Sequence, residues 1–182
     1  MKIKVCGMKN PQNISELAQL PVDLMGLIFY EKSPRYVENL DPKMVRSLPA
    51  SIQKVGVFVN ASMETISEKI RQYDLQFVQL HGNESPVFCK ELKASGVQVI
   101  KAFPIENAKD LTLSVLYAGV CDYYLFDTKT PDYGGSGEKF DWQLLAGYTG
   151  TTPFFLSGGI APEDMEAIHR LQLTNLYAID LN

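Results

Sequence analysis

Short hydrophobic runs alternate with longer amphipathic stretches along the whole chain. The hydrophobic runs are rich in Val, Ile, Leu and Phe and lack clean alternation, as is typical of parallel strands buried on both faces. They predict eight strands, at about Ile3–Gly7, Leu24–Phe29, Lys54–Val59, Phe77–Leu80, Val97–Phe103, Tyr123–Asp127, Pro153–Ser157 and Leu176–Asp180. The amphipathic stretches predict seven helices, at about Asn10–Leu20, Pro42–Leu48, Ser62–Tyr73, Pro86–Ser95, Asn107–Tyr117, Asp141–Gly147 and Pro162–Leu171.

This strand–helix alternation predicts a parallel α/β fold, either a closed barrel or an open doubly wound sheet. Strand ends at residues 6, 29, 59 and 81 recur at 103, 127, 157 and 180, an offset of 97 to 99 residues. A two-fold repeat favours a (β/α)8 TIM barrel built from two halves. No linker or low-complexity stretch interrupts it, so we expect one domain spanning residues 1–182.

The chain stops directly after the eighth predicted strand, so we expect the final helix of the barrel to be missing from it. The outer faces of the first and eighth strands should then lack cover. We expect exposed apolar side chains there, from Tyr177 or Ala178, Ile179, Leu181 and Ile3 or Val5.

Composition narrows the function classes. Of 182 residues, 46% are hydrophobic and 21% charged, values typical of a soluble globular protein. The net charge of −4 offers no global attraction for nucleic acid or anionic membranes, and no apolar run reaches the roughly 18 residues of a membrane helix. Three cysteines without CxxC spacing favour a reduced, cytoplasmic protein.

Titratable residues gather at the predicted strand ends, where a barrel of this type carries its active site. Cys6, His81, Asp127 and Asp180 each end a strand. Asp127, an acid finishing an apolar strand, favours a functional role, whereas Cys6 on position alone also fits a small buried hydrophobe. His81 has no second ligand at metal spacing, which favours the wall of a polar pocket. Arg35 fits either a carboxylate-binding residue or a solvated loop.

Two glycine clusters follow the sixth and seventh predicted strands, at 134–137 and 158–159. Glycines allow backbone N–H groups to converge on a phosphate, and a phosphate site near strands seven and eight recurs in this fold. Flexible loops are the alternative, and it fits the cluster at 134–137 equally well.

Six motifs then occur in order: Cys6–Asn10, Gly26–Phe29 with Ser33–Tyr36, Val55–Asn60, Val78–Glu84, the loop from Asp127 to Gly137, and Leu156–Ile160. Together they resemble the phosphoribosylanthranilate isomerase family of tryptophan biosynthesis, over residues 2–180. The resemblance implies an Amadori rearrangement of N-(5-phosphoribosyl)anthranilate to 1-(o-carboxyphenylamino)-1-deoxyribulose 5-phosphate.

The resemblance also implies site roles. Cys6 matches the general base that takes the proton from ribose C2, and Asp127 matches the general acid that protonates the ring oxygen. Arg35 matches the residue that binds the anthranilate carboxylate, and Gly135, Gly137, Gly158 and Gly159 match the phosphate loops. We place His81, Ser157 and Asp180 with them as substrate-binding residues.

The iminium intermediate of this reaction is its own electron sink, so we expect no metal and no organic cofactor. The expected partner is a small sugar phosphate, with no nucleic acid and no membrane, and the protein is expected to be a monomer or weak homodimer. Family members continue past the eighth strand with a phosphate-binding loop and a helix, and this sequence lacks both.

Three alternatives remain. Indole-3-glycerol phosphate synthase would need a lysine acid and a glutamate base on strand ends, and a sugar-phosphate epimerase would need metal ligands; neither set occurs here. The third is a barrel that binds the ligand without catalysis. The missing C-terminal segment favours it, while the retained Cys6 and Asp127 oppose it.

Overall fold

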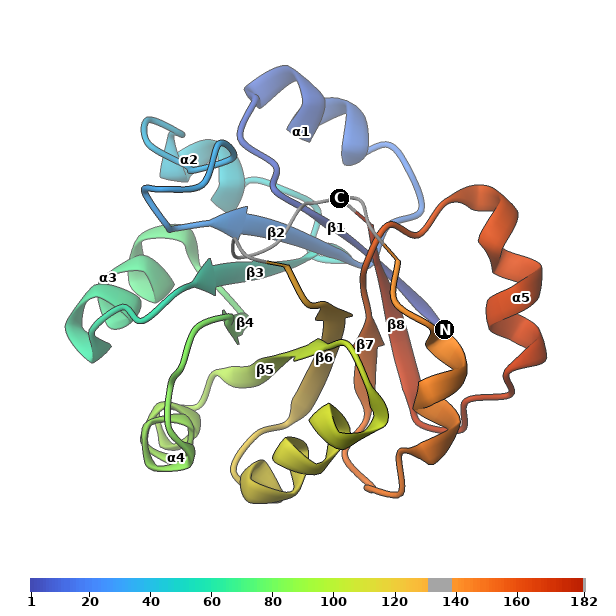
Figure 1. Cartoon of the computed structure of the whole chain (residues 1–182). Helices are drawn as coiled ribbons and strands as arrows, with labels where there is room; N and C mark the ends of the chain where they lie inside the picture. The colour runs from blue at the N-terminus through green and yellow to red at the C-terminus, as the bar shows by residue number, and fades with distance from the viewer. Residues whose placement is uncertain (131–138, 182) are drawn as a thin grey trace.

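Eight parallel strands close into a barrel in sequence order, which confirms the predicted architecture and excludes the open sheet (Figure 1). The structure is a computed structural model that describes residues 1–130 and 139–181. The strands are β1 (Lys2–Cys6), β2 (Leu24–Ile28), β3 (Gln53–Phe58), β4 (Phe77–Leu80), β5 (Gln98–Ile105), β6 (Tyr123–Thr128), β7 (Phe154–Leu156) and β8 (Leu176–Leu181).

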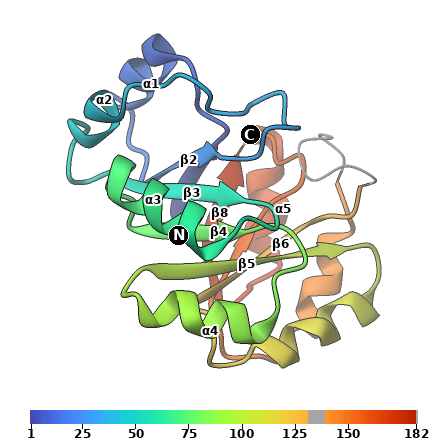
Figure 2. The same ribbon diagram turned by 90° about the vertical axis from the view of Figure 1, so that its left-hand side faces the viewer.

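The helices lie outside the barrel wall, and Figure 2 shows α3 and α4 on its outer surface. The α-helices are α1 (Pro11–Leu17), α2 (Pro42–Arg46), α3 (Met63–Tyr73), α4 (Pro86–Ala94) and α5 (Met165–Arg170). Side-chain oxygens of Asn10, Asp41, Ser62 and Ser85 accept backbone N–H groups at the starts of α1 to α4.

The helical stretches after β5 and β6 are 3₁₀ rather than α-helices: η1 spans Ala108–Tyr117 and η2 spans Trp142–Gly147. A third, η3 (Pro162–Asp164), precedes α5. In η1, the hydroxyl groups of Thr112 and Ser114 each donate to the carbonyl oxygen three residues earlier. Such bonds compete with the regular α-helical pattern and are compatible with the tighter winding.

The barrel interior is apolar at the amino end of the strands and polar at the other end. Alternate residues of seven strands form the lower layer: Leu24, Val55, Phe77, Ile100, Ala102, Leu125, Phe155 and Ala178. Tyr123 and Tyr177 add to it, with ring centroids 4.5 Å apart. This packed layer closes the lower end, so ligands can enter only where the polar strand ends lie.

The seam between β1 and β8 is less exposed than expected. Ile3, Val5 and Leu181 are half-buried, in partial agreement with the prediction, but Ala178 and Ile179 are only 0% and 3% exposed. Ala178 belongs to the interior layer, and Ile179 pairs in register with the buried Leu156 of β7. Of the alternatives Tyr177 and Ala178, Tyr177 is the half-buried one, and the expectation of exposure was wrong for Ile179.

Among the described residues, the helices are too short and too polar for any of them to cross a bilayer.

Candidate active site

A hollow of about 430 Å³ opens at the carboxyl ends of the strands. Its wall includes six of the residues that the sequence singles out: Cys6, Arg35, His81, Asp127, Ser157 and Asp180. These residues come from six different segments of the chain, and the closed barrel brings them to one mouth. The lining also includes Gln79 of β4, which the sequence analysis missed.

Cys6 ends β1 with its side chain in the mouth and is 8% exposed. Gly26 of β2 makes room for it, since a Cβ at position 26 would lie 2.7 Å from Cys6 Sγ. Burial raises the pKa of the Cys6 thiol, against the opposing effect of the Lys4 ammonium and the Arg35 guanidinium. All three cysteines of the chain are free thiols in the structure.

Arg35 lies over the end of β1. Its Nη1 donates a hydrogen bond of 3.2 Å to the carbonyl oxygen of Cys6. Gly7 permits this approach, because its φ is +82° and a Cβ there would lie 2.5 Å from Nη1. The guanidinium is thus fixed beside Cys6, with further donors left for an anionic ligand.

Asp127 ends the inward face of β6 and is 7% exposed. The Nε2 atom of His81 lies 3.5 Å from Asp127 Oδ2, and the Thr128 backbone N–H donates to Oδ1 at 2.9 Å. Burial works to raise the pKa of Asp127, but hydrogen bonds from His81, Ser157 and Thr128 outweigh it and hold that pKa below its ordinary value. His81 in turn contacts Gln79 Nε2 through Nδ1 at 2.8 Å.

A buried ion pair lies beneath the mouth. Lys4 Nζ donates to Asp180 Oδ2 at 2.6 Å, and the two side chains are 0% and 3% exposed. The carboxylate and the Cys6 side chain outweigh burial and raise the pKa of Lys4, whereas burial outweighs Lys4 and raises the pKa of Asp180. The raised pKa of Lys4 favours the charged form, whereas the raised pKa of Asp180 favours the neutral one. The 2.6 Å distance from Nζ to Oδ2 is typical of a charge-assisted hydrogen bond, so the pair is an ammonium and a carboxylate. Asp180 Oδ1 has no hydrogen-bond partner within the described residues.

The sequence analysis missed Lys4, although a signal was present. Lys4 and Cys6 are two residues apart on β1, so both point to the same side of the wall. A lysine on the inward face of a barrel strand has to find a buried partner. Asp180 is that partner, directly opposite Lys4 in the β1–β8 register.

The predicted phosphate loops are only partly covered by the structure. Gly158 and Gly159 follow β7 with φ values of +99° and +60°, a backbone path that favours glycine. Ser157 precedes them and is 1% exposed. Gly135 and Gly137 lie outside the described residues.

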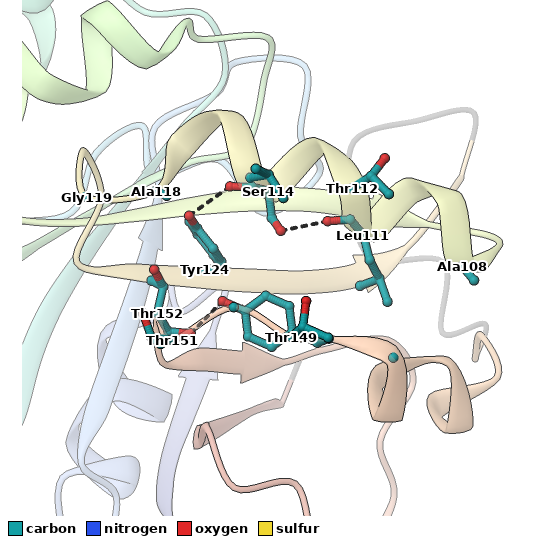
Figure 3. A pocket seen from close by; sticks show the side chains of 14 residues that line it. Ala108, Leu111, Thr112, Ser114, Ala118, Gly119, Tyr124, Thr149, Thr151 and Thr152 are labelled. Carbon is teal, nitrogen blue, oxygen red and sulfur yellow. Dashed lines mark hydrogen bonds between the residues drawn. The ribbon is translucent and has the colours of Figure 1, made fainter.

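A larger hollow, of about 960 Å³, lies elsewhere, on the outside of the barrel between η1 and η2 (Figure 3). The ionisable groups in its lining are Tyr124 and Tyr148, and their hydroxyls donate to the carbonyl oxygens of Ser114 and Thr152. It lacks an acid, a base and a cation, so the smaller hollow is the candidate site. Among the described residues, no group of three or more His, Cys, Asp or Glu side chains could hold a metal ion.

The mouth can perform acid–base chemistry on an anionic ligand. It offers a thiol on β1, a carboxyl group on β6 and a fixed guanidinium, and the glycine turn follows directly after the lining residue Ser157.

Comparisons with known proteins agree on one family. The family model of N-(5'-phosphoribosyl)anthranilate (PRA) isomerase matches residues 3–182. A relative from Parabacteroides distasonis, named N-(5'-phosphoribosyl)anthranilate isomerase, is 50% identical over all of this chain and 83% of its own length. One from Phocaeicola vulgatus with the same name is 45% identical, over all of this chain and 87% of its own.

Solved structures give the same result. The phosphoribosyl anthranilate isomerase of Thermotoga maritima is 34% identical with a TM-score of 0.84, covering all of this chain and 87% of that one. A second structure, 29% identical with a TM-score of 0.78, is a phosphoribosyl anthranilate isomerase in complex with reduced 1-(o-carboxyphenylamino)-1-deoxyribulose 5-phosphate. It covers all of this chain and 86% of that one.

Proposed function

The chain belongs to the N-(5'-phosphoribosyl)anthranilate isomerase family, and from this premise we propose how its barrel mouth carries out the reaction. The protein is an aldose–ketose isomerase of tryptophan biosynthesis. It converts N-(5-phosphoribosyl)anthranilate into 1-(o-carboxyphenylamino)-1-deoxyribulose 5-phosphate. The observation that carries the residue assignment is that a thiol and a carboxyl group from opposite parts of the chain share one mouth with a fixed guanidinium.

Asp127 is the general acid of the first step. Its proton goes to the furanose ring oxygen, the bond from that oxygen to C1 breaks, and the nitrogen lone pair forms the C1=N bond of the iminium ion. The free protein favours the carboxylate form of Asp127, whose pKa is lowered. The anionic substrate works against this, because nearby negative charge raises the pKa of a carboxyl group. His81 stands in contact with Asp127 and supports this proton transfer.

Cys6 is the general base of the second step. Its thiolate takes the proton from C2, and the electrons of that bond form the C1=C2 bond while the iminium nitrogen becomes an amine. The enol at C2 then becomes the ketone as C1 gains a proton. The iminium ion makes the C2 proton acidic, so this chain's own acid and base are sufficient for the step.

Binding comes from the remaining predicted residues. Arg35 pairs with the anthranilate carboxylate, and the turn from Ser157 to Gly159 holds the phosphate together with Gly135 and Gly137. Asp180 Oδ1, which has no partner among residues 1–130 and 139–181, accepts a hydrogen bond from a ribose hydroxyl.

The test is an isomerase assay that follows loss of the fluorescent anthranilate adduct. Cys6→Ser should keep the fold and nearly abolish turnover, because a hydroxyl is a far weaker base than a thiolate near neutral pH. Asp127→Asn should lower kcat by about 10²-fold or more. Wild-type turnover in either variant would remove that residue from the mechanism, and a folded but inactive wild-type chain would leave only ligand binding.

Arg35→Ala is the binding counterpart. It should chiefly raise KM, by a factor that corresponds to about 1.5–3 kcal/mol for a charge-assisted contact. An unchanged KM would place the anthranilate carboxylate elsewhere.

We further infer a single-domain cytoplasmic enzyme that works as a monomer or weak homodimer. Its three free thiols support a reducing compartment, and one similar structure is titled as monomers generated from a dimeric Thermotoga maritima enzyme. Sedimentation equilibrium over a range of protein concentrations tests the oligomeric state.

A further inference from the structure

Lys4 is a fully buried ammonium group for which the mechanism above has no role. It lies directly opposite Asp180 in the β1–β8 register and two residues before Cys6 on the same inward face. Its ammonium bonds Asp180 at 2.6 Å, and the nearby Cys6 side chain helps to raise the pKa of Lys4. It is thus a buried cation on the same inward face of β1 as the sulfur atom that has to become an anion.

We propose that Lys4 is a positioning residue for the base: its buried ammonium, on the same inward face of β1, stabilises the thiolate of Cys6. The inference rests on the proposed role of Cys6 as the base. It adds that the Lys4 ammonium is the group that stabilises the negative charge of the thiolate. A buried thiolate without a nearby cation is strongly disfavoured, and an opposite charge at contact distance offsets that penalty.

The other charged groups around Cys6 do not replace Lys4. Asp180 of β8 acts in the opposite direction, since its negative charge disfavours a second anion. Arg35, after β2, favours the thiolate, but it ranks below Lys4 in its effect and bonds the Cys6 carbonyl oxygen rather than the sulfur. In the assignment above, the positive charge of Arg35 is paired with the anthranilate carboxylate of the substrate.

Three further titratable groups line the same mouth: His81 from the end of β4, Asp127 from β6 and the phenol of Tyr30 after β2. The His81 ring contacts the Asp127 carboxylate, with Nε2 3.5 Å from Oδ2. Tyr30 packs against the apolar side chains around Cys6. Lys4 therefore dominates the stabilisation of the thiolate.

The experiment measures the thiolate directly, without substrate. The rate of iodoacetamide alkylation at Cys6 is followed by peptide mass spectrometry from pH 6 to 10 in the wild type and in Lys4→Met. Loss of the ammonium should move the midpoint of the profile upward by about 1 to 3 pH units. The acidic limb of the kcat/KM profile should move in the same direction.

Two matched variants separate this role from a merely structural one. Asp180→Asn removes the negative charge and should move the midpoint downward, opposite to Lys4→Met. Lys54→Met removes another buried lysine, on β3, whose partner Asp74 is exposed, and should leave the midpoint unchanged. If Lys4→Met fails to fold, the double variant Lys4→Met/Asp180→Asn takes its place, with a smaller upward shift expected.

A midpoint within about 0.3 units of the wild type in the folded lysine variant would overturn the proposal. Shifts of the same sign in Lys4→Met and Asp180→Asn would also overturn it. Failure of the proposed function looks different: full turnover in Cys6→Ser would remove the base whatever the alkylation profiles show.

Discussion

Two lysine–carboxylate pairs are buried among the described residues, one inside the barrel and one outside its wall. Lys101 and Glu84 are each 3% exposed and lie 3.2 Å apart between the wall and its helices. Lys101 also donates to the carbonyl oxygens of Leu80, Gly82 and Ala102, and Glu84 accepts the backbone N–H groups of Asn60 and Gly82. The pair between Lys4 and Asp180 is equally buried, but one carboxylate oxygen finds no partner in the part of the chain that the structure describes.

The difference separates a structural pair from a functional one. A buried charge whose every hydrogen-bonding position is filled by the protein has nothing left to offer a ligand. The pair of Lys101 and Glu84 is of this kind, and it fixes the loops after β3 and β4 in place. A buried charge that lacks a partner is costly in the free protein and can recover that cost when a ligand supplies the missing donor. Four measurements would break or sharpen this comparison.

The largest effect is expected from breaking the pair of Lys101 and Glu84, called the saturated pair below because the protein fills all its hydrogen-bonding positions. Lys101→Met removes the cation beside Glu84, whose buried carboxylate then keeps only two backbone N–H groups as partners. This unpaired buried charge should lower the free energy of unfolding by about 3–5 kcal/mol. Urea unfolding followed by circular dichroism measures it. Lys4→Met should cost less, because burial already favours a proton on Asp180. Equal losses in the two variants would contradict the comparison.

The second effect is on activity. Asp180→Asn turns a charged acceptor into a neutral one and should lower kcat/KM about tenfold, since charge-assisted hydrogen bonds are roughly twice as strong as neutral ones. Glu84→Gln should reduce stability but leave kcat/KM near the wild-type value. Steady-state assays of both, at a temperature where both remain folded, test the contrast. A larger kcat/KM loss in Glu84→Gln would reverse the assignment of the two pairs.

A smaller effect is expected at the edge of the saturated pair. The Tyr117 hydroxyl donates a 2.9 Å hydrogen bond to the Glu84 carbonyl oxygen. Tyr117→Phe should therefore lower the free energy of unfolding by about 0.5–1.5 kcal/mol without changing kcat. Thermal unfolding and the isomerase assay check the two halves of this expectation; a tenfold loss of kcat would connect this pair to the chemistry.

The smallest effect is expected at a pair that is only half removed from water. Lys54 Nζ lies 2.9 Å from Asp74 Oδ2, but the Asp74 side chain is 58% exposed. The hydrogen bond from Lys54 lowers the pKa of Asp74, so the pair stabilises the fold above the ordinary carboxyl pKa and loses this effect as pH falls.

Asp74→Asn should accordingly cost no more than about 1 kcal/mol at pH 7, and the difference from wild type should vanish near pH 3. Asparagine tolerates the positive φ of +53° at this position, which makes it a suitable replacement. Urea unfolding at the two pH values measures the difference. A constant difference at both would show that backbone effects, rather than the charge, are being measured.

The barrel itself could be predicted from the sequence, because every strand is a compact apolar run and the two halves repeat. The 3₁₀ winding of η1 and η2 could not be predicted in this way. Thr112 and Ser114 lie in an amphipathic stretch, and only the folded chain shows that their hydroxyls bond carbonyl oxygens within it. Likewise, no local pattern records that Ile179 is buried beside Leu156 of the neighbouring strand.

The candidate site shows the same division. Cys6, His81, Asp127 and Asp180 stand at strand ends, so the barrel alone predicts that they meet. Lys4 stands in the middle of a strand, and it enters the site only through its register with β8. Gln79 is similar, because its contact with His81 requires knowing which face of β4 points inward. Residues beneath the mouth are thus found from pairing rather than from motifs.

The bond between Lys4 and Asp180 joins positions separated by 176 residues. During synthesis on a ribosome the amino end emerges first, and early strands can begin to pair before the later ones exist. Cys6 on β1 therefore lacks its complete charge environment until β8 has been made and has docked against β1. Catalytic competence is in this way tied to the closure of the barrel between β1 and β8, because a chain that has not formed this seam lacks the ion pair of Lys4 and Asp180.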